Sequence, residues 1–183
     1  ALLYVANSPS VIHLSDHEGK DPIVLLDLPR QETLVDIGAY CLMPNHFHLL
    51  LKELNDGNIS RFMLKLQTGY PMYFKKKYQR TGSVFEGPFR AKHVADDNYL
   101  KYLFAYIHLN PVKIIDPQSW EKKIIPDIDQ AKNYLSQYRF SSLPHYLGEK
   151  LPENKILNSK SFPDYFAPNT EKFSDFINDW LTY

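Results

Sequence analysis

The chain has 183 residues, of which 44% are hydrophobic, and this length and composition are typical of one globular domain. No stretch approaches the roughly 18 continuous apolar residues of a membrane span. The first residues lack the pattern of a secretory signal, and a single cysteine excludes an internal disulfide. These features predict a cytoplasmic protein without disulfides.

The formal net charge is zero, but the charges are unevenly distributed along the chain. Residues 1–60 carry 3 basic and 8 acidic side chains, whereas residues 61–92 carry 8 basic side chains and 1 acidic one. A basic segment of this kind is either a solvated helix face or a surface for an anionic partner. Charge alone does not decide between the two interpretations.

The first third of the chain predicts a helix end, an insertion and a hairpin. The apolar residues before Asn7 resemble the end of an amphipathic helix, so we expect further sequence to precede residue 1. Residues 11–33 have the composition of a loop-rich insertion. Residues 34–43 and 46–54 are two predicted strands, and the Pro44-Asn45 pair between them indicates a hairpin.

The middle of the chain predicts a helix followed by a third strand. Apolar residues recur at helical spacing over 59–78, and Pro71 is expected to kink or divide this helix. Residues 83–94 have a strand-like composition, with Gly87-Pro88 predicting a bulge or bend.

The following segment predicts a helix over 97–110, with Asp96 or Asp97 as its N-cap. Pro111 is expected to end it. Shorter helices are predicted near 127–136 and 171–181. Helices and hairpin-connected strands in this order favour an α+β fold with an antiparallel sheet.

The segment AYCLMPNHFHLLLKE, residues 39–53, contains the first candidate site. On a strand, His46 and His48 project from one face, while Phe47 faces the other way. Two imidazoles roughly 6–7 Å apart along a strand can hold one metal ion or one phosphate. A histidine pair of this kind is also typical of half-buried side chains that are satisfied by their neighbours.

The second candidate site is Tyr106 with Asn110, which are four residues apart and therefore share one face of the predicted helix. Two imidazoles and an amide oxygen leave open positions on a divalent ion, which suits Mg²⁺ or Mn²⁺ holding a phosphate. A tyrosine beside such an ion is a candidate nucleophile. A tyrosine at helical spacing is also typical of core packing.

The basic segment supplies candidate contacts to a nucleic acid. Cationic side chains bind backbone phosphates, and aromatic side chains such as Tyr73, Tyr78 and Phe85 can stack on unpaired bases. The predicted DNA-binding residues are Lys75, Lys76, Lys77, Arg80, Arg90 and Lys92.

Three segments, in order and spacing, resemble the REP-associated tyrosine transposases, which belong to the single-tyrosine family of the HUH superfamily. They are AYCLMPNHFHLLLK, LQTGYPMYFKKKYQRTGSVFEGPFRAKHV and YLKYLFAYIHLNPVK. The resemblance covers residues 34–115, and YRFSSLPHYLG at 138–148 is similar to a tail segment of that family.

The resemblance implies a ferredoxin-like antiparallel sheet with helices packed mainly on one face. Residues 1–148 are then the transposase-like domain, without the family's first strand and with the insertion near 11–33. Residues 149–183 are a helical or irregular C-terminal extension.

The same resemblance assigns roles to the candidate residues. His46 and His48 are implied as metal ligands, Asn110 as the third ligand, Tyr106 as the nucleophile, and Mg²⁺ or Mn²⁺ as the cofactor. The implied activity is cleavage and rejoining of hairpin-bearing single-stranded DNA through a 5′-phosphotyrosine. The protein is expected to be prokaryotic, nucleoid-associated, and a monomer or homodimer.

Two other functions compete with this interpretation. One is a non-catalytic, domesticated protein that binds DNA hairpins. The other is a small metal hydrolase that uses His46 and His48 together with His93 or His108.

Overall fold

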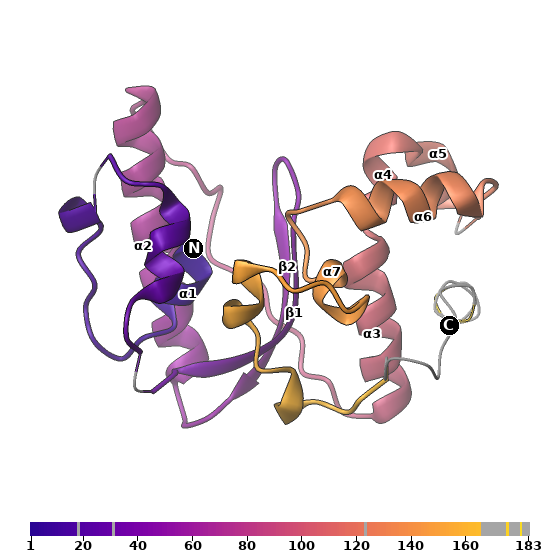
Figure 1. Cartoon of the computed structure of the whole chain (residues 1–183), viewed down its shortest axis with the longest axis horizontal. Coiled ribbons are helices and arrows are strands. Elements are labelled where there is room, and N and C mark those ends of the chain that lie inside the picture. Colours follow the sequence, from indigo (N-terminus) through magenta and orange to yellow (C-terminus); the bar gives the residue numbers. More distant parts are fainter. Residues whose placement is uncertain (18, 31, 123, 166–174, 176–179, 181–183) are drawn as a thin grey trace. The chain divides into compact units, whose positions relative to one another are not determined.

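The computed structural model describes residues 1–165 except 18, 31 and 123, together with Asp175 and Trp180 (Figure 1). The helix predicted for 171–181 therefore lies largely outside the described residues. The chain divides into two compact units: Ala1–Asp36 with Leu51–Lys92 forms unit 1, and Ile37–Leu50 with His93–Tyr183 forms unit 2.

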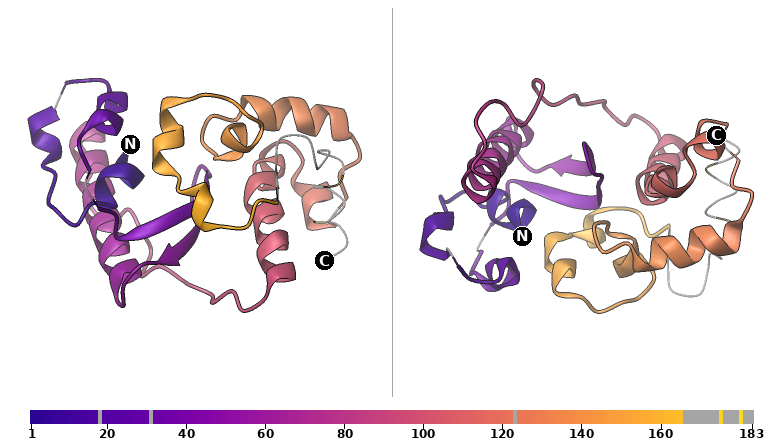
Figure 2. Two further views of the ribbon diagram at one scale, coloured as in Figure 1. Left: turned by 60° about the horizontal axis from the view of Figure 1, so that its bottom comes forward. Right: turned by 90° about the horizontal axis from the view of Figure 1, so that it is seen from above.

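The described residues form helices, short 3₁₀ turns and one sheet, which confirms the predicted α+β class (Figures 1 and 2). The elements in order are α1 (Leu2–Ala6), η1 (Leu14–His17), η2 (Pro22–Asp27), β1 (Val35–Leu42), β2 (Phe47–Glu53), α2 (Asn58–Tyr78), α3 (Asp97–Leu109), α4 (Val112–Ile115), α5 (Pro117–Glu121), α6 (Ile128–Gln137), α7 (Leu143–Tyr146), η3 (Pro152–Ile156) and η4 (Ser159–Ser161).

Strands β1 and β2 form the predicted hairpin, and they are the two strands of the sheet in the described part of the chain. The first seven residues of β1 are all buried, as expected for a strand that is covered on both faces. The backbone N–H of Met43 donates to the carbonyl of His46 at 2.8 Å, which closes the turn around Pro44-Asn45.

The predicted third strand at 83–94 is wrong, because this described segment has no strand. Most of its side chains are exposed, and Gly87-Pro88 interrupts its pattern. A strand-like composition produces a strand only where a neighbouring edge supplies hydrogen bonds. One edge of β1 pairs with β2, and the backbone at its other edge bonds to residues 140–142 instead.

Helix α2 runs without division through Pro71, so of the expected kink or division, the division is wrong. Proline lacks the N–H that would bond to the carbonyl one turn earlier, but the neighbouring turns keep their own bonds. Three buried residues, Phe62, Met63 and Leu66, lie in the first half of the helix, where it packs on α1.

Unit 1 is held together by polar contacts as well as by packing. Asn7 is buried after α1, and its side chain accepts from the N–H groups of Leu34 and Val35 at 3.0 and 2.9 Å. On α2, Arg61 donates to the Pro9 carbonyl at 2.9 Å, and Lys65 donates to the carbonyls that flank it. These bonds fix the chain that follows α1 along α2.

Unit 2 is organised around α3, whose Asp96 N-cap accepts from the backbone N–H of Tyr99 at 2.8 Å. Toward the sheet, Phe104 and Ile107 of α3 pack on the buried residues Ala39, Cys41 and Leu50. Helix α3 thus covers one side of the hairpin.

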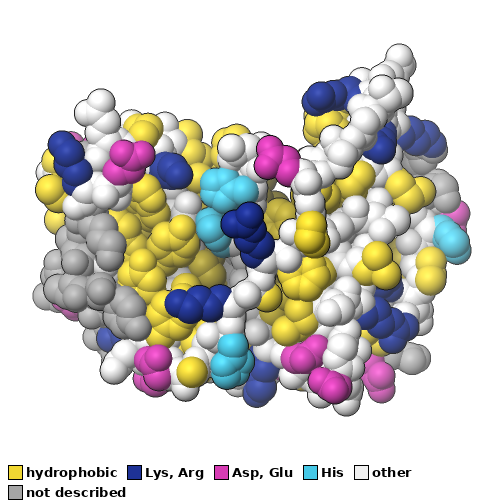
Figure 3. Space-filling model, turned by 180° about the vertical axis from the view of Figure 1, so that it is seen from behind, with side chains coloured by type: hydrophobic (Ala, Val, Ile, Leu, Met, Phe, Trp, Pro, Cys, Tyr) yellow, Lys and Arg dark blue, Asp and Glu magenta, His cyan; other side chains and the backbone are white. Residues whose placement is uncertain are grey.

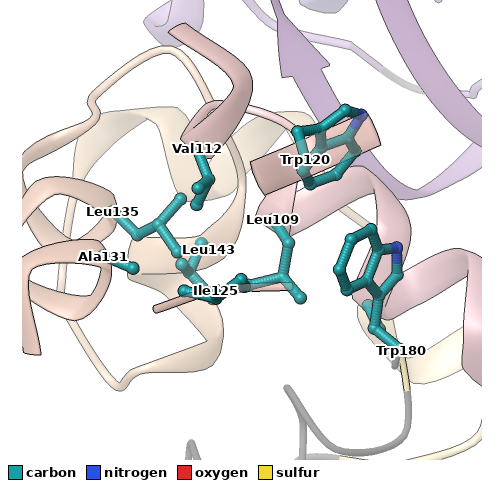
Figure 4. Packing of buried hydrophobic residues seen from close by; sticks show 9 residues of the cluster. Leu109, Val112, Trp120, Ile125, Ala131, Leu135, Leu143 and Trp180 are labelled. Atoms are coloured by element: carbon teal, nitrogen blue, oxygen red, sulfur yellow. The ribbon is translucent and has the colours of Figure 1, made fainter. Parts of the chain in front are cut away.

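A second face of α3 packs against the short helices that follow it (Figure 4). Trp120 and Trp180 stack there with ring centroids 4.6 Å apart. The cluster consists of Ala105, Leu109, Val112, Trp120, Ile125, Ala131, Leu135, Leu143 and Trp180. Helix α3 is thus packed on two faces within unit 2.

Candidate functional site

The two histidines and the tyrosine singled out from the sequence meet in unit 2. The rings of His46 and His48 are 5.0 Å apart, and the rings of His48 and Tyr106 are 5.3 Å apart, both edge to face. His46 is exposed at the tip of the hairpin, and His48 is half-buried on β2. Histidine side chains reach the surface on the face shown in Figure 3.

His46 is oriented by its neighbour Asn45. The Nδ1 atom of His46 lies 2.7 Å from Oδ1 of Asn45. An amide oxygen is an acceptor, so Nδ1 carries the proton and donates it. The lone pair of the neutral ring is then on Nε2, which is the arrangement that a metal ligand needs.

One ring nitrogen of His48 is buried without a hydrogen-bond partner in the described residues. This atom, Nε2, is inaccessible to solvent. A buried polar atom without a partner costs roughly 1–3 kcal/mol. Burial, followed by the charges of His46 and Lys113, lowers the pKa of His48 to about 4. The ring is therefore neutral at neutral pH and able to coordinate a cation.

Lys113 was not among the candidate residues from the sequence, but its charge acts on both histidines. Burial and the Lys113 ammonium both lower the pKa of His46, and the ammonium acts on His48 in the same direction. Lys113 is exposed, just after Asn110 in the segment NPVK. Its distance of three residues from Asn110, across a helical turn, was the signal that could have identified it.

Tyr106 is half-buried between the histidine pair and other aromatic rings of α3 and α5. Its ring stacks on Tyr102 at 6.0 Å and contacts Trp120 at 5.8 Å. These contacts fix the ring plane beside His48. The same ring contacts are the core packing that is typical of a tyrosine at helical spacing.

Asn110 caps the C-terminal end of α3 and is 1% exposed. Its side-chain nitrogen donates to the carbonyl of Tyr106 at 3.3 Å. This bond uses the amide nitrogen, so the oxygen is the atom with which Asn110 would act as a ligand. The residue is thus tied to the same helical turn as Tyr106.

Metal binding by the candidate residues stays a prediction. Within the described residues, no group of three or more His, Cys, Asp or Glu side chains could hold a metal ion. The three-histidine cluster that the hydrolase alternative needs is therefore not present in these residues. His108 is buried against Ser142 instead. The structure brings His46 and His48 together, and it ties Asn110 to the backbone carbonyl of Tyr106.

The six predicted DNA-binding residues lie in unit 1. Lys75, Lys76 and Lys77 form the last turn of α2, where cations complement the helix dipole. Lys77 lies over the rings of Tyr73 and Tyr78, at 5.6 and 5.4 Å.

The other three predicted DNA-binding residues follow α2 along the chain. Arg80 lies 6.0 Å from the Phe74 ring, and Arg90 and Lys92 are exposed in the irregular segment 83–94. Cations and aromatic rings thus alternate over this part of unit 1.

The site therefore consists of a histidine pair at the start of β2, one member of which, His48, contacts Tyr106 on α3. Residues 28–110, a little under half of the chain, match the model of the family described as Transposase IS200 like. The match is consistent with a single-tyrosine (Y1) transposase of the HUH superfamily. No curated protein and no solved structure gave a match.

The family match has general consequences for the chain. It associates the matched segment with DNA transposition, with the cleavage and transfer of DNA, and with DNA as the partner. No helix among the described residues is both long enough and apolar enough to cross a membrane.

Proposed function

We propose that the protein is a metal-dependent endonuclease and transposase that cleaves and rejoins hairpin-bearing single-stranded DNA, with Tyr106 as the nucleophile. The observation that carries the proposal is the contact between Tyr106 and His48, whose buried Nε2 has no protein partner in the described residues. His46, His48 and Asn110 would hold the ion. A bound Mg²⁺ or Mn²⁺ supplies Lewis-acid stabilisation of charge at the phosphate.

In the proposed step, the Tyr106 oxygen forms a bond to a backbone phosphorus and loses its proton. The bond from phosphorus to the 3′ oxygen breaks, and that oxygen takes up a proton. The products are a 5′-phosphotyrosine and a free 3′-OH. Because the new phosphodiester retains the energy of the old one, a 3′-OH can reverse the step and rejoin the strands without ATP.

Lys113 is the chain's own cation beside the histidine pair. Its electrostatic effect on both imidazoles supports a role in binding the attacked phosphate. The cations of unit 1, from Lys75 to Lys92, are proposed to bind the DNA backbone elsewhere along the strand.

The direct test is a covalent adduct. The protein is incubated with labelled hairpin-bearing single-stranded DNA and Mg²⁺ or Mn²⁺, and the products are separated on a denaturing gel. We expect an adduct that Tyr106→Phe abolishes and that the matched control Tyr102→Phe retains. An adduct that survives Tyr106→Phe and disappears in Tyr102→Phe would contradict the assignment.

A second variant separates cleavage from binding. His46→Ala is expected to abolish cleavage while hairpin affinity stays nearly constant, because affinity depends on the basic residues of unit 1. Equal loss of both would contradict this division. Hairpin binding without any adduct in the wild-type chain would instead favour the non-catalytic DNA-binding protein.

A further inference from the structure

Residues 138–142 form an edge along β1 that the strand pattern did not predict. The backbone N–H of Leu42 donates to the carbonyl of Phe140 at 2.8 Å. The backbone N–H of Ser142 donates to the carbonyl of Tyr40 at 2.9 Å, and Cys41 and Ser141 form an antiparallel bridge. A segment about a hundred residues later in the chain is therefore fixed to β1.

The side chain of Ser142 joins this edge to helix α3. Its Oγ accepts from the backbone N–H of Tyr40 at 2.9 Å and lies 2.6 Å from Nε2 of His108. Ser142 is 2% exposed and His108 is fully buried, so water does not compete for either group. One hydroxyl thus connects the backbone of β1 to a side chain of α3.

His108 is suited to this connection by its surroundings. The rings of Phe104 and Tyr146 lie 6.1 and 5.2 Å from its own ring. Burial lowers the pKa of His108 to about 3, against a backbone hydrogen bond to Phe104 that raises it. The neutral ring shares a hydrogen bond with the Ser142 hydroxyl without placing a charge in the core, and the tautomer of the ring decides which group donates.

The connection completes a closed set of contacts around the candidate site. Strand β1 pairs with β2, which carries His48, and the ring of His48 contacts Tyr106 on α3. Two residues beyond Tyr106, His108 returns to β1 through Ser142. Because successive helical residues differ by about 100° in direction, Tyr106 and His108 project from different sides of α3.

We propose that His108 and Ser142 are positioning residues, which hold α3 on β1 so that Tyr106 stays in contact with His48. The inference rests on the proposed function for its catalytic consequence. The structural claim, that this pair holds α3 on β1, concerns unit 2 alone. The two parts can therefore be tested separately.

Three single variants isolate the pair. Ser142→Ala removes the hydroxyl, and His108→Phe keeps an aromatic ring in the aromatic pocket but removes both nitrogens. Ser141→Ala is the matched control, because Ser141 is also buried in the same segment and its Oγ accepts from the nearby backbone N–H of Leu143, at 3.3 Å. If Ser142→Ala does not fold, His108→Phe carries the test.

The first measurement needs neither DNA nor metal. In protein with labelled His and Tyr rings, a nuclear Overhauser effect between the His48 and Tyr106 ring protons reports their contact. We expect Ser142→Ala and His108→Phe to lose most of this signal and Ser141→Ala to keep it. Full retention of the signal in folded Ser142→Ala or His108→Phe would overturn the proposal.

The second measurement is the single-turnover rate of adduct formation at saturating DNA. Misplacement of a nucleophile by about 1 Å can cost on the order of a hundredfold in rate. We expect both variants to be at least about tenfold slower, with the half-saturating DNA concentration unchanged within about twofold. The double variant should be no slower than either single variant, because both remove one interaction; multiplied effects would overturn the proposal.

The two measurements also distinguish which proposal fails. If the wild-type protein forms no adduct but Ser142→Ala loses the ring contact, the proposed function fails and the positioning role stands. If the adduct forms at the wild-type rate in Ser142→Ala and His108→Phe, the positioning role fails and the proposed function stands.

Discussion

Acid should destabilise unit 2 through His108, and His108→Phe should remove part of this effect. Burial lowers the pKa of His108 to about 3, whereas an unfolded histidine has its ordinary value near 6.5. Between these values the unfolded chain binds a proton that the folded chain does not. The free energy of unfolding therefore falls as the pH falls from about 6.5 toward 3.

The magnitude follows from the distance below the unfolded pKa. At pH 5 the difference is about 1.5 pH units, and each unit is worth about 1.4 kcal/mol, so the loss from His108 is about 2 kcal/mol. Because His108 is fully buried, solvent screening does not reduce this value much. Phenylalanine has no group to protonate, so the variant should lose about 2 kcal/mol less than the wild type between pH 7 and pH 5.

Urea unfolding followed by tryptophan fluorescence measures this difference. The two tryptophans of the chain, Trp120 and Trp180, both belong to unit 2, so the signal reports that unit. EDTA keeps the histidine pair free of metal. His93→Phe is the matched control at an exposed position, and it should behave as the wild type does. An equal loss in His108→Phe and in the wild type would refute the reasoning.

Four further substitutions test packing and the site. Gly38→Ala should lower the free energy of unfolding by about 1–3 kcal/mol, because a Cβ there would lie 2.8 Å from the Phe162 ring. The control Gly69→Ala, on helix surface with no atom near the new Cβ, should raise the free energy of unfolding by about 0.5–1 kcal/mol. Equal urea midpoints for the two variants would contradict this. Lys113→Ala should slow adduct formation by about tenfold, and a rate equal to the wild type would exclude Lys113 from phosphate binding. Asn45→Ala should weaken Mn²⁺ binding by roughly tenfold in titration calorimetry, because the Nδ1 proton of the neighbouring imidazole loses its acceptor; unchanged affinity would refute the role.

The elements that the sequence predicted well are those with local signals. The hairpin of β1 and β2 follows from two apolar runs around Pro44-Asn45, and α3 follows from an Asp N-cap and a terminal Asn-Pro. Helix α6 likewise begins after Asp127, whose side chain accepts from the N–H of Gln130. In each case the residues that specify the element lie within it or next to it.

The elements that the sequence predicted wrongly depend on distant partners. Residues 83–94 have the composition of a strand, but β1 bonds to β2 on one side and to residues 140–142 on the other. No periodicity within 83–94 can indicate whether an edge is available to it. Pairing across about a hundred residues is a property of the folded unit.

The candidate site divides in the same way. His46 with His48, and Tyr106 with Asn110, have the spacing that places two residues on one face of a predicted strand or helix, so periodicity could select them. That the first pair contacts the second is a tertiary fact, visible in the ring contact between His48 and Tyr106. The metal ligation and the nucleophilic role of these residues remain predictions.

His108 shows why residue type alone misleads at such a site. From the sequence, His108 was a candidate third metal ligand together with His46 and His48. Its Nε2 is 2.6 Å from a serine hydroxyl in a core without water access, so it cannot also bind an ion that must reach the substrate. The half-buried Tyr106 and the fully buried His108 lie only two residues apart on α3. Under the two proposals, His108 holds α3 on the sheet and Tyr106 of the same helix attacks the DNA.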